Sequence, residues 1–229
     1  MVLAMKTEMH VHTSEVSPCA CVKAKDIVVL YWQAGYDAIV ITDHFNNYVL
    51  EQYKGSEKQK VERYLKGYLK AKEEGERIGL KVFFGIESHL LPERADFLFY
   101  GATPDFLLEY PKLYELSQKE AFEVCCRHGI LFLQAHPFRH QGPRNPEYMH
   151  GMEVYNGNLR NPSHNALTAR FVRQYPQFIL TSGSDFHMYE DVGCGGMFLP
   201  DISDETELAK VLKEGSDVSL IRFDGGTLC

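Results

Sequence analysis

The 229-residue sequence has little of what marks a secreted, membrane-spanning or nucleic-acid-coating protein. No apolar run approaches the roughly 18 residues of a transmembrane helix. Residues 1–5 are too short for the apolar core of a signal peptide. No basic run exceeds two residues, and the formal net charge is −7. We therefore expect a cytoplasmic protein with no membrane contact, for which nucleic acid is not the expected partner.

Paired cysteine motifs are also scarce. The six cysteines include Cys19 and Cys21, but no second CxC or CxxC accompanies them, which argues against a four-cysteine zinc site. In a reducing compartment we expect free thiols rather than a disulfide framework. No cysteine, serine or aspartate nucleophile with a dedicated base is evident, so the sequence does not indicate covalent catalysis.

What the sequence does contain is a regular alternation of strand and helix patterns over its whole length. We predict strands at 6–12, 37–42, 81–86, 96–100, 130–135, 151–155, 178–181 and 218–222. Helices are predicted at 22–34, 51–78, 117–127, 163–174 and 204–214, with a loop at 193–196. This alternation predicts one α/β domain over residues 1–229 with a mainly parallel sheet.

The first predicted strand ends in two histidines, His10 and His12. Residues i and i+2 of a strand share one face, so both imidazoles would reach into the same space. Alone this is a weak indication of a metal site. It becomes stronger because further histidines and carboxylates follow at the ends of other predicted strands, where α/β barrels place their sites.

Seven such residues stand out, and all are metal ligands of the hard or borderline kind. They are His10, His12, His44, Glu87, His136, Asp185 and His187. Their number exceeds what one tetrahedral zinc ion needs. We therefore expect a cluster of two or three divalent ions, with Zn, Mn or Fe as candidates.

The motifs that carry these residues resemble those of the PHP (polymerase and histidinol phosphatase) family. They are HVHT at 10–13, ITDH at 41–44, GIE at 85–87, AHP at 135–137 and SDFH at 184–187, in the family's order. The resemblance covers nearly the whole chain. It implies a single-domain, TIM-like, distorted (β/α)7 barrel and, as is usual in the family, three metal ions.

The resemblance also implies a role for each ligand. The first ion would be held by His10, His12 and Asp185. Glu87 would bridge this ion to a second one, which His136 also binds. The third ion would be held by His44 and His187. Glu87, Asp185 and His187 are accordingly the expected catalytic residues.

Two ligand positions do not follow from the family pattern. Members place a further ligand shortly after HxHT, where Glu15 and Cys19 are the candidates here, and we favour Glu15 because a carboxylate matches the rest of the set. Members often also have a histidine between the glutamate strand and the His-Pro strand. Residues 95–110 contain none, so His89, which shares a strand face with Glu87, is the candidate for this position.

Three further residues are predicted to surround the substrate. Arg139 follows His136-Pro137 and suits an anionic group, because its planar fork donates two hydrogen bonds at once. Glu153 and Asn156 lie near a strand end, as substrate contacts or as partners of the metal ligands. Arg144 and Arg160 are weaker candidates.

These residues predict hydrolysis of a phosphate ester by a water molecule activated by metal ions. The acidic composition favours a small phosphomonoester, similar to histidinol phosphate, as substrate. A phosphodiesterase or exonuclease of the same fold is the alternative within catalysis. A non-catalytic, metal-binding regulatory domain is the alternative outside it. The sequence leaves the oligomeric state open.

Overall fold

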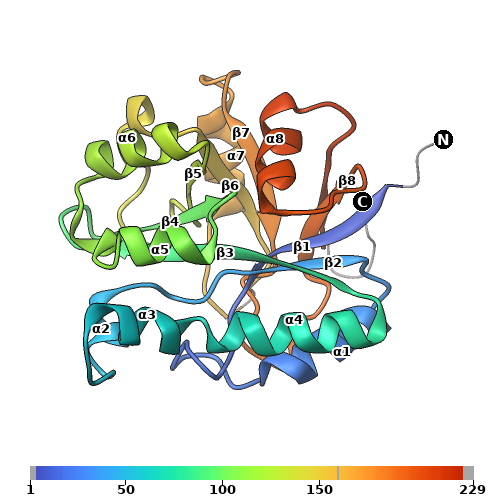
Figure 1. Cartoon of the computed structure of the whole chain (residues 1–229). Coiled ribbons are helices and arrows are strands. Elements are labelled where there is room, and N and C mark those ends of the chain that lie inside the picture. The colour runs from blue at the N-terminus through green and yellow to red at the C-terminus, as the bar shows by residue number, and fades with distance from the viewer. Residues whose placement is uncertain (1–3, 159, 224–229) are drawn as a thin grey trace.

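A nine-stranded sheet forms the body of the molecule. The computed structural model describes residues 4–158 and 160–223. The strands are β1 (Met5–Val11), β2 (Ala38–Ile41), β3 (Lys81–Leu90), β4 (Ala95–Tyr100), β5 (Leu131–Gln134), β6 (Gly151–Asn156), β7 (Ile179–Gly183), β8 (Gly195–Leu199) and β9 (Ser219–Arg222). They are hydrogen-bonded in the order β7-β6-β5-β4-β3-β2-β1-β8-β9 (Figure 1).

The sheet curls until its first and seventh strands nearly meet. Past the end of β7, Phe186 forms a parallel bridge with Val11 of β1. The amide of Phe186 donates to the carbonyl of His10, and the amide of His12 donates to the carbonyl of Phe186, both at 3.0 Å. The expected barrel is thus present as a nearly closed sheet, which brings the two ends of the chain's ligand series together.

The expectation of a mainly parallel sheet is not borne out. Of the eight strand pairings, β1–β2, β2–β3, β5–β6 and β6–β7 are parallel, and the other four are antiparallel. Only four residues separate β3 from β4, whereas a parallel crossover needs a dozen or more. The predicted loop at 193–196 is wrong in part, because Gly195 and Gly196 begin β8 and pair with β9.

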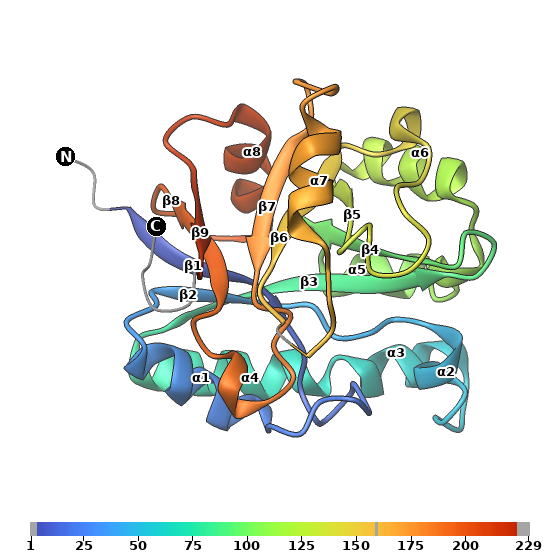
Figure 2. The ribbon, with the colours of Figure 1, turned by 180° about the vertical axis from the view of Figure 1, so that it is seen from behind.

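Helices pack against both faces of the sheet. They are α1 (Ala24–Gln33), α2 (Asn47–Leu50), α3 (Glu57–Tyr64), α4 (Lys66–Ile78), α5 (Pro104–Glu109), α6 (Gln118–His128), α7 (Asn165–Val172) and α8 (Glu205–Glu214). Short 3-10 turns lie at Leu113–Glu115, Pro146–Tyr148 and Tyr189–Asp191. Helices α1 to α4 lie along one side of the molecule, and α7 packs behind β6 and β7 (Figures 1 and 2). Among the helices described, none is long and apolar enough to cross a membrane.

Local sequence signals explain where several helices begin and end. Ser117 and Glu120 form the predicted capping box at the start of α6. Gly79 and Gly129 end α4 and α6 in the left-handed conformation that glycine adopts without steric penalty. The cysteines of the described chain, Cys19, Cys21, Cys125, Cys126 and Cys194, are free as expected, while Cys229 lies outside the described residues.

Two apolar clusters fix the strands. One contains outward-facing side chains such as Ile39 and Ile41, packed with Ile27 and Tyr31 of α1. The other contains side chains from the opposite faces of the strands, such as Val40 and Phe83, together with Leu208 and Leu212 of α8. Because alternate residues share a face, Glu87 lies on the same face of β3 as Phe83. Its carboxylate therefore enters the interior of the sheet, above this second cluster.

Candidate metal centre

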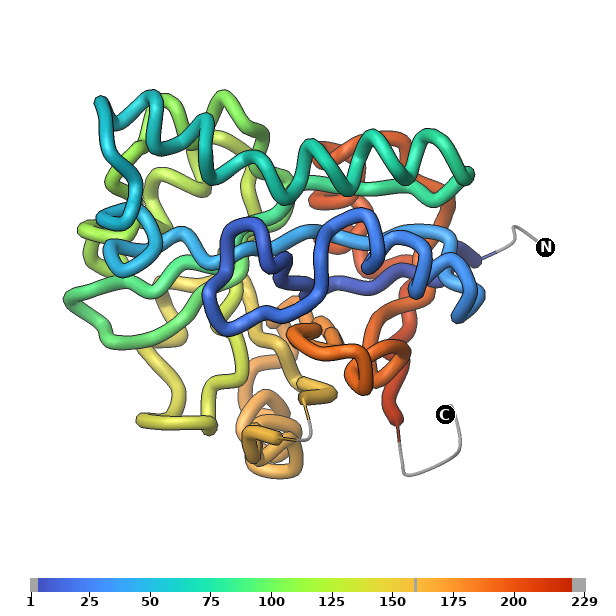
Figure 3. Tube along the Cα trace, turned by 90° about the horizontal axis from the view of Figure 1, so that it is seen from below, coloured from blue at the N-terminus to red at the C-terminus, as the bar shows by residue number. Residues whose placement is uncertain are grey.

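The predicted ligands converge at one end of the barrel. Three groups of side chains bring their ligand atoms within 4.8 Å of one another: His10, His12 and Asp185; Glu87, Asp96 and His136; and His12, His44 and His187. They come from β1, β3 and β4 and from the segments that follow β1, β2, β5 and β7. Seen from below, the segment after β1 lies beside the segment after β7 (Figure 3).

Glu87 occupies the centre of the cluster. Its Oε1 lies 3.0 Å from His136 Nε2 and 3.4 Å from His10 Nε2. Its Oε2 lies 2.7 Å from His44 Nδ1 and 3.4 Å from His12 Nε2. Each carboxylate oxygen thus faces a different pair of imidazoles, which is the arrangement a carboxylate needs to bridge two ions.

Asp185 faces the cluster with one oxygen and Arg139 with the other. Its Oδ1 lies 3.5 Å from His10 Nε2, 3.3 Å from His12 Nε2 and 3.4 Å from His187 Nδ1. Its Oδ2 lies 2.7 Å from Nη1 of Arg139. The backbone of Asp185 has a positive φ of 52°, a conformation that Asp tolerates better than most residues. The ion pair and this backbone conformation together aim Oδ1 at the histidines.

For His10 and His187, hydrogen bonds determine which ring nitrogen is available to a metal ion. Nδ1 of His10 lies 2.8 Å from Glu153 Oε1 and so carries the proton. Nδ1 of His187 donates to the Asp185 carbonyl at 2.8 Å. Nε2 is therefore the nitrogen of each ring that can bind a metal ion, which requires it to carry no proton.

His12 is oriented through a chain of two further residues. The hydroxyl of Ser17 donates to Asp43 Oδ1 at 2.7 Å and therefore accepts from Nδ1 of His12, which lies 3.3 Å away. Asp43 also accepts from the amide and the hydroxyl of Thr13, both at 2.7 Å. This network explains why Thr13 and Asp43 belong to the motifs although neither side chain is among the grouped ligands.

The protonation states of the carboxylates and of His12 favour the binding of a cation. Burial opposes ionisation of Glu87 and Asp185, but the neighbouring His10 imidazole and other positive groups outweigh it and hold the pKa of each carboxyl well below its usual range. Burial, with the charges of His44 and His187, lowers the pKa of His12 far below its ordinary value. Ionised carboxylates beside a neutral imidazole suit divalent cations.

Buried atoms without partners test whether metal ions fit here. Nε2 of His10 and Nε2 of His12 are buried, and neither has a hydrogen-bond partner within the described part of the chain. Such orphaned polar atoms are rare in native interiors. A divalent ion bound by these nitrogens and by Glu87 and Asp185 would satisfy them, so the residues present fit a metal centre.

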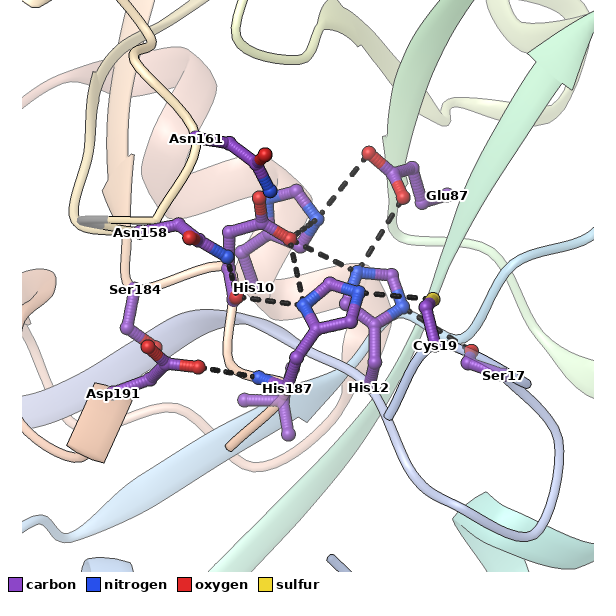
Figure 4. Close-up of polar contacts among 12 residues, drawn as sticks. His10, His12, Ser17, Cys19, Glu87, Asn158, Asn161, Ser184, His187 and Asp191 are labelled. Atoms are coloured by element: carbon purple, nitrogen blue, oxygen red, sulfur yellow. Dashed lines mark hydrogen bonds and ion pairs between the residues drawn. The ribbon is translucent and has the colours of Figure 1, made fainter. Parts of the chain in front are cut away.

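The prediction of Glu15 as a ligand is not supported by its position. Its carboxylate accepts the Ala24 amide at 2.9 Å and pairs with Lys70 at 3.2 Å, which caps α1 and points the side chain away from the cluster. The alternative residue, Cys19, lies at the cluster instead, with Sγ 3.2 Å from His187 Nε2 (Figure 4).

The prediction of His89 as a ligand is also not supported. Its side chain is outside the three groups, and its Nδ1 lies 2.8 Å from Oδ1 of Asp96. Asp96 itself joins Glu87 and His136 in the second group. Of these two residues, Asp96 is thus the one that the structure places with Glu87 and His136, and His89 contacts it. The sequence offered a signal, since Asp96 begins a predicted strand.

Glu153 and Asn156 contact the side chains and backbone that surround the cluster. Both are buried. Besides His10, Glu153 binds the amide of His136 at 3.0 Å and the Asn156 amide group at 2.9 Å. Asn156 Oδ1 accepts from Arg139 at 2.8 Å. These contacts favour the second of the two roles predicted for Glu153, that of a partner of the metal ligands. Asn156 supports Glu153 and Arg139 in turn. Arg139 remains next to the cluster through Asp185.

The Cys19 thiol has an unusual acidity that can be measured directly. Burial opposes its ionisation, but hydrogen bonds to His187 and His44 and the charges of these imidazoles outweigh it and lower its pKa to about 6. Burial raises the pKa of Cys126, which is also exposed. We expect alkylation of Cys19 in metal-free protein to rise with pH and to be half-maximal near pH 6, because the thiolate is the nucleophile.

Mass spectrometry of iodoacetamide-treated protein across pH would measure both sites in one sample. Cys126 serves as the internal control and should react only in more alkaline solution. Equal pH profiles for the two cysteines would contradict the acidity of Cys19.

Comparisons with known proteins agree with this geometry. A model of the PHP domain family matches residues 8–215 of the chain. A search of curated proteins gives no significant match.

Solved structures of similar fold were found at low sequence identity. One is a two-domain protein from Bacteroides vulgatus containing a predicted PHP-like metal-dependent phosphoesterase, with 18% identity, a TM-score of 0.69 and coverage of 96% of this chain and 65% of that one. PsfC from Pseudomonas syringae has 16% identity, a TM-score of 0.63 and coverage of 96% and 92%. The lesion-specific endonuclease PfuEndoQ from Pyrococcus furiosus has 13% identity, a TM-score of 0.65 and coverage of 96% and 59%. The chain thus spans less than two thirds of the first and last of these proteins, and the likeness concerns the fold.

Proposed function

This chain belongs to the PHP domain family, whose model spans residues 8–215, and we propose that it is a metal-dependent phosphoesterase acting on a small phosphomonoester. The observation that carries the proposal is the pair of buried, unpartnered Nε2 atoms of His10 and His12 beside the carboxylates of Glu87 and Asp185. Bound cations would pair with these buried nitrogens and carboxylates. The three groups of ligand atoms support more than one ion.

Each group of ligands would hold one ion. His10, His12 and Asp185 would hold the first; Glu87, Asp96 and His136 the second; and His44 and His187 the third, with Glu87 shared between the first two. When bound, divalent ions lower the pKa of water and neutralise charge on phosphoryl oxygens. The protein's own part is to hold these ligands in place, through Glu153, Ser17 and Arg139.

The charge balance favours a phosphate substrate. Three divalent ions carry a charge of +6 and the carboxylates of Glu87, Asp96 and Asp185 carry −3, so the loaded centre would have a charge of about +3. An acidic protein can in this way attract an anion at one point. The attraction between such a centre and its substrate is greatest for a dianionic phosphomonoester.

The cationic side chains near the centre favour a small substrate over a polynucleotide. Arg139 is engaged by Asp185, and Arg160 is engaged by both oxygens of Asp191. Proteins that follow a nucleic-acid backbone need several free basic groups along a groove. A phosphodiesterase remains the second candidate because the fold is also that of PfuEndoQ, a lesion-specific endonuclease.

A substrate screen with the metal varied would test the proposal. Purified protein loaded with Mn, Zn or Fe is expected to release phosphate from small phosphomonoesters and to leave a single-stranded oligonucleotide intact. Nucleotide release without phosphate release would favour the diesterase. No turnover of either class in any metal would contradict the proposal.

Removal of metal separates catalysis from a regulatory or structural role. Treatment with a chelator is expected to abolish turnover while the circular dichroism spectrum stays that of a folded α/β protein, because two apolar clusters hold the strands without the ligands. Restoring the metal should restore turnover. Global unfolding on chelation would instead indicate a structural centre.

A further inference from the structure

The segment after His12 carries a cysteine to the edge of the metal centre. In Figure 4, Cys19 lies beside the rings of His12 and His187. Its Sγ is 3.2 Å from His187 Nε2. Two donors bound to one tetrahedral zinc ion, at about 2.3 Å for sulfur and about 2.0 Å for nitrogen, are about 3.5 Å apart. The observed separation is close to this value.

The segment is held in one conformation by contacts at both of its ends. Asp43 binds Thr13 and Ser17 at its start, as described above. At its end, the amide of Cys21 donates to the His187 carbonyl at 2.9 Å. Between Thr13 and Ser17, the Glu15 carboxylate accepts the Ala24 amide and pairs with Lys70, which directs it away from the cluster. These contacts turn Glu15 away from the centre and leave Cys19 as the residue of the segment that faces it.

Two imidazole nitrogens on this side of the cluster can bind a metal ion. Nδ1 of His187 donates to a backbone carbonyl, so its Nε2, next to the sulfur, is the nitrogen left for a metal ion. His12 Nε2 is fully buried and unpartnered within the described chain, and its ring centroid lies 4.3 Å from that of His187 and 4.2 Å from that of His44. Ligand atoms of His12, His44 and His187 thus lie within 4.8 Å of one another, and the sulfur lies 3.2 Å from one of these imidazoles, at Nε2 of His187.

We propose that Cys19 is a thiolate ligand of the third metal ion, together with His44 and His187, and that this ion is zinc. The inference rests on the proposed metal centre. It departs from the carboxylate or histidine that the family places after HxHT. Thiolates favour zinc over manganese, which prefers oxygen ligands. The third site would thus differ in metal preference from the carboxylate-rich second site formed by Glu87, Asp96 and His136.

X-ray absorption spectroscopy of the zinc-loaded protein would test the sulfur ligand. We expect a zinc–sulfur shell at about 2.3 Å beside the zinc–nitrogen shell at about 2.0–2.1 Å. Cys19→Ser should lose the sulfur shell and one of the bound zinc ions. Cys21→Ser is the matched control, since Cys21 faces Met188 instead, and should keep both. Circular dichroism would verify that each variant is folded.

A second variant keeps the test decisive if Cys19→Ser is unstable. Cys19→Asp should restore a ligand without sulfur and shift the competition between manganese and zinc toward manganese on the order of tenfold. Bound zinc without a sulfur shell in the unaltered protein would overturn the role of Cys19 and leave the metal centre standing. Absence of bound metal altogether would overturn the proposed function as well.

Discussion

Asp185→Asn is expected to reduce phosphoesterase turnover about 10³-fold, because stabilisation by a metal ion amounts to several kcal/mol and 1.36 kcal/mol corresponds to a factor of ten. The change removes the charge that faces His10 and His12 and leaves Arg139 without its counter-ion. Asparagine is chosen because it tolerates the positive φ of this position, where alanine would be strained. Steady-state phosphate release measures the effect.

The expected loss must be separated from a loss of folding. Asp201→Asn is the matched control, since Asp201 is exposed and pairs with Lys81, which begins β3 at the end away from Glu87. Thermal unfolding should change little in either variant, and the metal content should fall only in Asp185→Asn. Turnover close to that of the unaltered protein would remove Asp185 from the centre.

The positions of most ligands could be predicted from the sequence because strand ends are easy to recognise. His10, His12, His44 and His136 lie where apolar runs stop, and the barrel gathers the ends of its strands in one place. Closure of the sheet between β1 and the end of β7 then brings Asp185 to His10 although they are far apart in sequence. The motifs at the strand ends were therefore sufficient to predict which of these side chains lie close together.

Residues whose position depends on a loop could not be predicted in this way. Glu15 and Cys19 lie in one irregular segment, and their directions follow from contacts with Ala24, Lys70 and Asp43 that no spacing rule contains. Chemical similarity to the other predicted ligands favours Glu15, whereas the contacts of the segment turn Glu15 away from the cluster and place Cys19 beside His187.

The edge between β3 and β4 explains why Asp96 is absent from the predicted ligands. The sequence predicts a strand at 81–86 that delivers Glu87, with His89 on the same face where the strand continues. β3 does continue to Leu90, and it pairs antiparallel with β4. In that register Glu87 lies opposite Leu98, and His89 lies opposite Asp96. The short hairpin thus brings Asp96, a second carboxylate, next to Glu87, and His89 contacts Asp96. Strand ends alone do not reveal a ligand that arrives on the neighbouring, antiparallel strand.

A buried carboxylate below the centre gives the largest expected effect on stability. Oε1 of Glu8 accepts the amides of Met9, His10 and Ser184 at 2.9, 3.0 and 2.8 Å, and Oε2 accepts the Tyr31 hydroxyl at 3.1 Å. Glu8 is fully buried, and it joins β1 to the segment that carries Asp185. Glu8→Ala is expected to lower the free energy of unfolding by about 3–5 kcal/mol, because it leaves several buried donors unpaired.

The comparison with Glu8→Gln identifies the cause of that loss. Glutamine keeps an oxygen for the three amides and can donate to the Tyr31 hydroxyl, so we expect a loss of about 1 kcal/mol, the usual value of a single hydrogen bond. Urea unfolding of both variants measures the difference at constant slope. Glu207→Ala, which removes a partly exposed carboxylate that accepts the Ser203 amide at the start of α8, is the surface control. If alanine and glutamine lowered stability equally, the charge of Glu8 rather than its role as hydrogen-bond acceptor would hold β1 to the Asp185 segment.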